Sequence, residues 1–197
     1  ERIIDVIDHF RLVEQAGSVP YNSILPGVGN SYFAQGRTLV DNTGLTLAEF
    51  NSTITAMAHL GDRVILALEN IGLIVVNPFD VLRPFRQLSN EPLIGHVSKL
   101  LVKADKLAVI VDGKLKLYDL DGNAIEPAAY VGISGTVFDV ITHQDKFVAL
   151  SNQNLSVVND NGSLDNTKRI DGRFTAIVKV AEDLLLSSTT SMSLVNS

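Results

Sequence analysis

The run Asp119-Leu120-Asp121-Gly122-Asn123 has the residue types and spacing closest to those of a metal-binding motif. Oxygen-bearing side chains alternate along it, as at the opening of a Ca²⁺-binding loop. The glycine precedes the asparagine instead of following it, however, and no Glu stands where the twelfth loop position would fall. An Asp-Gly hairpin turn is therefore the favoured interpretation, and we predict no metal site.

Other patterns that could support catalysis are absent from the sequence. No serine lies in a G-x-S-x-G context, and the chain has no Cys that could act as a nucleophile or thiolate ligand. The run Gly27-Val28-Gly29-Asn30 lacks the spacing and the following helical pattern of a phosphate-binding loop. We predict no catalytic residue and no cofactor.

Composition excludes several classes of partner. The 197 residues carry 22 acidic and 16 basic side chains, for a net charge of -6, which argues against nucleic-acid binding. No apolar run reaches the roughly 18 residues that a membrane-spanning helix needs, so we expect no membrane insertion. The absence of Cys favours a secreted or cell-envelope location, although an intracellular scaffold agrees with it too. Because the first residue is Glu, we interpret the chain as a piece of a longer protein.

A repeated pattern sets the positions of the strands. Segments beginning at Ile54, Val97, Val137 and Phe174 each read as a strand, a tight turn containing Asp, and a second strongly apolar strand. The pattern recurs about every 40 residues, the length of a propeller blade. A third strand follows each time, and a weaker, more polar fourth strand follows in two of these repeats.

These repeats predict an all-β fold, a β-propeller of four-stranded blades, with about five blades or a fragment of a larger ring. We treat residues 1–197 as a single domain. The last blade is incomplete, and residues 9–15 would supply its outer strand if the ring closes. A short N-terminal helix is the alternative for that region. The expected blades span residues 20–50, 53–92, 96–132, 136–171 and 173–197.

One of these blades resembles a WD40 repeat. Gly95-His96 matches the Gly-His pair of that family, Asp105 its turn aspartate, and Tyr118-Asp119 its Trp-Asp pair. The other copies read Gly135-Thr136 or Gly172-Arg173 at the first position and Val-Asn at the last. The resemblance implies a platform for protein partners rather than an enzyme. Other propeller families include lectins, lactonases and glycosidases, so the fold alone does not choose among these functions.

The residues that begin each innermost strand are candidates for ligand contact at the channel mouth. They are Thr53, His96, Thr136 and Arg173, and none is an acid that could help to hold a metal ion. His96 could act as a base or a hydrogen-bond donor, and the alternative is a structural histidine bonded within its blade. Arg173 could bind an anion, and the alternative is a solvated turn residue.

A segment between two blades is the candidate partner surface. Aromatic and Arg side chains often anchor protein interfaces, although here the rings could instead wedge between blades. We expect a non-enzymatic scaffold that binds a protein or peptide, with the remainder of a larger propeller chain as a further partner. A carbohydrate-binding or adhesive propeller is the alternative, against which the absence of Trp argues, and a hydrolase or lactonase is the third. The candidate contacts are Phe79, Arg83, Phe85 and Arg86.

Overall fold

The computed structural model describes residues 21–27, 31–78, 86–122, 124–181 and 183–195. Within these ranges the regular secondary structure consists of strands, which form five antiparallel sheets. No helix capable of crossing a membrane is found among them. The predicted all-β class is confirmed.

Each of the first four sheets is a meander of four strands, and the fifth has three described strands. The first sheet contains β1 (Ser23–Leu25), β2 (Tyr32–Gln35), β3 (Thr38–Asp41) and β4 (Thr46–Glu49). The second contains β5 (Ile54–Leu60), β6 (Arg63–Leu68), β7 (Gly72–Asn77) and β8 (Arg86–Pro92). The third contains β9 (Val97–Lys103), β10 (Lys106–Val111), β11 (Lys114–Asp121) and β12 (Ala124–Tyr130). The fourth contains β13 (Val137–His143), β14 (Lys146–Ser151), β15 (Asn154–Val158) and β16 (Leu164–Arg169). The fifth contains β17 (Ala176–Val180), β18 (Asp183–Ser187) and β19 (Met192–Val195).

The second strands of the middle sheets are apolar on both faces. β6 and β10 have the sequences RVILAL and KLAVIV, and every residue after the first is buried in each. A strand in an open sheet would alternate between apolar and polar residues, so continuous burial means that both faces are covered. The neighbouring sheets provide that cover.

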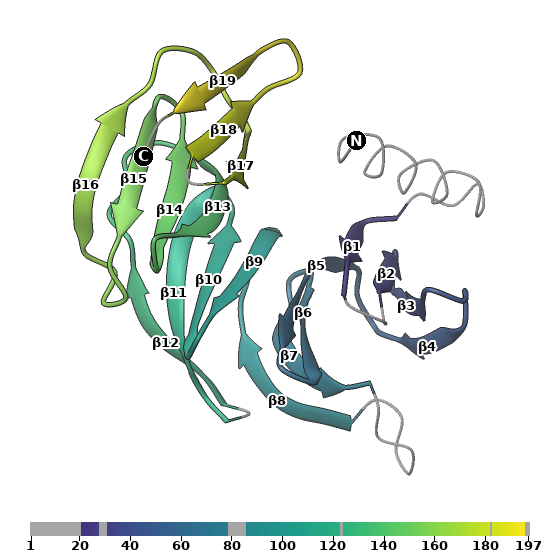
Figure 1. Cartoon of the computed structure of the whole chain (residues 1–197). Helices are drawn as coiled ribbons and strands as arrows, with labels where there is room; N and C mark the ends of the chain where they lie inside the picture. The colour runs from purple at the N-terminus through teal and green to yellow at the C-terminus, as the bar shows by residue number, and fades with distance from the viewer. Residues whose placement is uncertain (1–20, 28–30, 79–85, 123, 182, 196–197) are drawn as a thin grey trace.

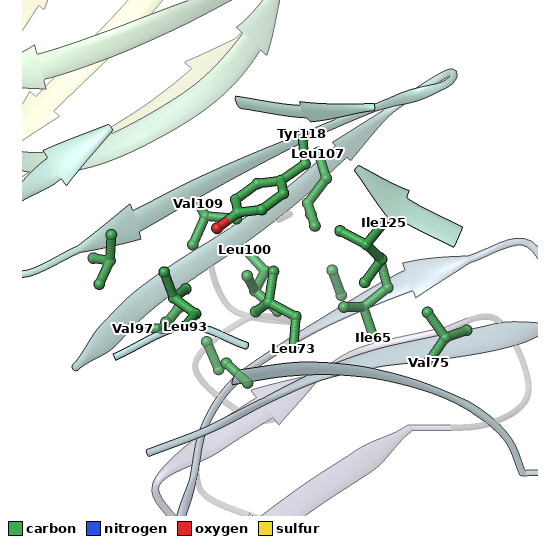
Figure 2. Close-up of a cluster of buried hydrophobic side chains, with 14 residues drawn as sticks. Ile65, Leu73, Val75, Leu93, Val97, Leu100, Leu107, Val109, Tyr118 and Ile125 are labelled. Atoms are coloured by element: carbon green, nitrogen blue, oxygen red, sulfur yellow. The ribbon is translucent and has the colours of Figure 1, made fainter. Parts of the chain in front are cut away.

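The sheets pack face to face in sequence order. Four buried apolar clusters lie between consecutive sheets, one at each junction from the first sheet to the fifth. Figure 2 shows the junction of the second and third sheets, where Ile65 and Leu73 meet Leu107 and Tyr118. Burial of apolar area at these junctions, at about 25 cal/mol per Å², is the main stabilising contribution of the arrangement.

Consecutive sheets meet through their first strands. β1, β5, β9, β13 and β17 contact one another in turn, whereas β8 and β12 meet at the outer side. The sheets therefore follow an arc, with the first sheet in purple at one end and the fifth in yellow at the other (Figure 1). The outermost strands tolerate Pro92 and Pro127 because an edge strand can lose one backbone donor without breaking the sheet. The predicted N-terminal helix and the predicted closing strand at residues 9–15 lie outside the described residues.

Candidate interaction surface

Three of the predicted channel-mouth residues directly precede a first strand. Thr53, His96 and Thr136 come immediately before β5, β9 and β13, while Arg173 lies three residues before β17. The backbone N–H of His96 donates to Asp112 Oδ1 at 2.9 Å, and the N–H of Asp112 donates back to the His96 carbonyl at 3.0 Å. His96 is thus fixed by the turn between the second and third strands of its own sheet.

The glycine before His96 is required by this arrangement. Gly95 has a φ of 124°, which L side chains rarely adopt, and a Cβ there would lie 2.3 Å from Asp112 Oδ2. The imidazole of His96 is exposed, and its Nδ1 lies 3.4 Å from Glu69 Oε1 of the second sheet. The side chain of His96 therefore contacts the preceding sheet, whereas its backbone forms hydrogen bonds within its own sheet.

The ligand-contact role of these four residues stays a prediction. Across the described ranges, no polar contact joins any two of Thr53, His96, Thr136 and Arg173, and Arg173 is exposed. Nor do the described His, Asp and Glu side chains form a group of three that could hold a metal ion. Among the residues that the structure describes, the imidazole of His96 contacts the Glu69 carboxylate and has no hydrogen bond to a nucleophile of the kind that covalent catalysis needs.

The predicted partner segment cannot be placed. Phe79, Arg83 and Phe85 lie outside the described residues, and so does the side chain of Arg86, although its backbone begins β8. These contacts therefore remain predictions.

A buried carboxylate that the sequence analysis did not single out joins three sheets. Asp139 on β13 pairs with Lys99 Nζ of the third sheet through Oδ1, which also accepts from the N–H of Val140 at 2.9 Å. Its Oδ2 accepts from the backbone N–H of Ile177 in the fifth sheet at 2.9 Å. The signal was present in the sequence, since an Asp flanked by apolar residues in the strand VFDVITH has to be paired when buried.

The fifth sheet has one buried face and one exposed face. On one face Ile177, Leu184 and Leu186 pack against the fourth sheet. The residues that alternate with them point away, and four large apolar side chains there are between 46% and 76% exposed. We call these four the outer patch: Val178, Val180, Met192 and Leu194.

A hollow of about 440 Å³ lies between the fourth and fifth sheets, beside β19. Buried Ile170 and Phe174 are among its lining residues, together with Ser193, Leu194 and Val195 of β19. Its polar lining consists mainly of charged residues. These are Lys168, Arg169 and Asp171.

Comparison with known proteins gives the fold its name. No protein-family model and no curated protein sequence matches the chain. Among solved structures, BamB from Moraxella catarrhalis superposes with a TM-score of 0.70 at 11% identity over 90% of this chain. The β-propeller domain of Cps50 (Swd1) from Myceliophteria thermophila superposes with a TM-score of 0.67 at 12% identity over 87%. The chain is a β-propeller.

The propeller also resembles BBS1N, solved in complex with ARL6DN, with a TM-score of 0.68 at 11% identity over 85% of this chain. It spans 58% of the BamB chain, 63% of the Cps50 chain and 61% of the BBS1N chain. These proteins therefore extend well beyond the matched region. At sequence identities this low, the similarity to these structures concerns the fold alone. The function of this propeller has to be argued from its own surfaces.

Proposed function

We propose that this propeller works without catalysis as a scaffold that binds a protein partner, and that the partner contacts the fifth sheet. The single observation that carries the proposal is the outer patch, formed by Val178, Val180, Met192 and Leu194. Contiguous exposed apolar surface of this kind usually marks an interaction site.

The contrast with the other junctions supports this assignment. At each junction between consecutive sheets, facing side chains such as Leu107 and Leu186 are fully buried. The outer patch occupies the equivalent position on the last sheet, yet Met192 is 76% exposed and Leu194 is 56% exposed. A partner that covered these side chains would remove apolar area from water, which is favourable at about 25 cal/mol per Å².

The propeller BBS1N provides a precedent for the class of function, since it was solved in complex with another protein. Propellers with enzymatic activity also exist, so this precedent supports the proposal only together with the outer patch.

Site-specific photo-cross-linking in the organism of origin tests the proposal. A benzophenone amino acid at position 194 would sit within the outer patch, and one at position 94 provides a matched control, because Ile94 is also apolar and is 85% exposed. We expect a light-dependent adduct with a defined protein from position 194 and none from position 94. The cross-linked protein, once purified, should bind the wild-type chain and should lose affinity for Leu194→Glu.

Two outcomes would contradict the proposal. Equal adducts from positions 194 and 94, or none from position 194, would show that the outer patch has no specific partner. Hydrolysis of ester, lactone or glycoside substrates by the wild-type chain but not by His96→Ala would show that the propeller is an enzyme.

A further inference from the structure

We infer that the outward edge of β19 binds an extended peptide as an added β-strand, and that this peptide carries acidic side chains. This inference rests on the proposed scaffold function and specifies the class of partner that the propeller binds. Strand addition at a sheet edge gives affinity through backbone hydrogen bonds, and alternate side chains give specificity.

The first step is the unpaired edge. The third strands of the other sheets, β3, β7, β11 and β15, each pair with a strand on both sides. Within the described ranges β19 pairs with β18 alone. Among the described strands none bonds to the outward N–H and C=O groups of β19, and a further strand there would give the fifth sheet four strands like the others.

The second step is the space beside that edge. The outer strands β8 and β12 of the second and third sheets contact each other. The corresponding position next to β16 holds the hollow of about 440 Å³, which β19 lines through Ser193, Leu194 and Val195. An added strand would therefore occupy space that is already present, with buried Ile170 and Phe174 along the wall.

The third step is charge. In the register of the fourth sheet Lys168 lies opposite Leu155, which packs toward the fifth sheet, so Lys168 projects on the side of the hollow. Arg169 also lines the hollow, and among the described residues neither cation has an ion pair. Asp171 is the acid in the lining. The local excess of positive charge, in a chain of net charge -6, favours an acidic ligand.

The fourth step is the alternation that β19 imposes on its ligand. Ser193 and Val195 share a face with buried Leu186 and Leu184, so ligand residues opposite them face the fourth sheet and Lys168. Ligand residues opposite Met192 and Leu194 would extend the exposed apolar face. The preferred sequence thus alternates acidic with apolar side chains.

The test uses capped seven-residue peptides and the complete chain. One peptide alternates Val and Glu, a second alternates Val and Lys, and a third is the Val-Glu peptide with N-methylated backbone amides, which cannot donate to a strand. Binding is followed by fluorescence anisotropy, and the contact is located by hydrogen exchange of the β19 amides. We expect the Val-Glu peptide to bind and to slow exchange in β19, the Val-Lys peptide to bind more weakly, and the N-methylated peptide to fail.

Charge reversal provides the matched variants. Lys168→Glu should weaken binding of the Val-Glu peptide about tenfold. The attraction between residue 168 and the glutamates of the peptide becomes a repulsion. Lys114→Glu makes the same change on exposed surface at the start of β11 and should leave the affinity unchanged. Both substituted side chains are exposed, so both variants should remain folded.

Three results would overturn the inference. The β19 amides could already be protected without peptide, which would show that the chain pairs this edge itself. The peptides could leave β19 exchange unchanged, or the Val-Glu and Val-Lys peptides could bind equally well. If position 194 nevertheless cross-links a partner, the proposed scaffold function stands and only strand addition fails.

Discussion

The carboxylate of Asp139 on β13 accepts a hydrogen bond from the backbone N–H of Ile177 on β17 at 2.9 Å. Through its other oxygen the same carboxylate pairs with Lys99 of β9. Three neighbouring first strands are thus joined by one nearly buried side chain. Among the described residues, this contact and one apolar cluster attach the fifth sheet to the fourth.

Removal of this carboxylate should loosen the fifth sheet. For Asp139→Ala we expect the free energy of unfolding to fall by about 2–4 kcal/mol, because two backbone N–H groups and Lys99 lose a charged acceptor. Urea denaturation measures the loss, and hydrogen exchange should show the largest acceleration in β17 and β18. Asp165→Ala removes an exposed partner of Lys146 and should cost less than about 1 kcal/mol. Equal losses for the two variants would contradict the joining role of Asp139.

The two faces of the fifth sheet should respond differently to truncation. Leu186 is fully buried against the fourth sheet, so Leu186→Ala should destabilise the chain by about 2–5 kcal/mol. Leu194 on the adjacent strand is 56% exposed, so Leu194→Ala should change stability by less than about 0.5 kcal/mol. Thermal or urea unfolding of the purified chain distinguishes the two. A large loss for Leu194→Ala would mean that the outer patch is covered within the chain itself.

Tyr32 should make the propeller sensitive to alkaline pH. Burial, with a smaller contribution from the charge of Asp41, raises the pKa of the Tyr32 phenol above its ordinary value. Its stabilising contribution is therefore complete below the unfolded pKa of about 10 and is lost as the pH rises through the higher folded pKa. Tyr32→Phe should reduce the loss of stability between neutral pH and about pH 11.

At neutral pH the same variant should not be destabilised. The Tyr32 hydroxyl is buried, and no hydrogen-bond partner for it is found among the described residues, so Tyr32→Phe should raise the free energy of unfolding by up to about 1 kcal/mol. Tyr130 is 64% exposed, and Tyr130→Phe serves as the control with no expected change. Destabilisation of Tyr32→Phe in urea at pH 7 would show that the hydroxyl is bonded.

The close approach of β7 and β8 should forbid a side chain at Gly72. A Cβ there would lie 2.1 Å from the carbonyl oxygen of Glu91, and the φ of 141° is unfavourable for L residues. We expect Gly72→Ala to lower the free energy of unfolding by about 2–4 kcal/mol. Gly61, in an open turn, has nothing within 4 Å of its Cβ position, and Gly61→Ala should cost about 1 kcal/mol. Circular dichroism during urea titration gives both values, and a tolerated Gly72→Ala would contradict the described strand pairing.

Much of the fold could be predicted because the relevant signals are local. Strand, turn and apolar strand recur within each stretch of about 40 residues, and the paired strands of each sheet are adjacent in the chain. The predicted strand beginning at Val97 starts β9 at the same residue, whereas the one predicted from Phe174 begins at Ala176. Hairpin turns and the alternation of apolar and polar side chains depend on residues that are close together in the chain. The sequence alone therefore predicts them.

The candidate site was largely beyond sequence reasoning. Asp139 meets Lys99 and Ile177 from one repeat before and one repeat after its own, and no short-range pattern connects residues so far apart. The strand sequence of β19 likewise does not reveal whether Leu194 is covered. The sequence by itself determined where strands form and that consecutive blades bury their apolar faces. Only the tertiary structure decided which face of the last sheet stays exposed, because exposure depends on whether another sheet packs there rather than on the strand's own residues.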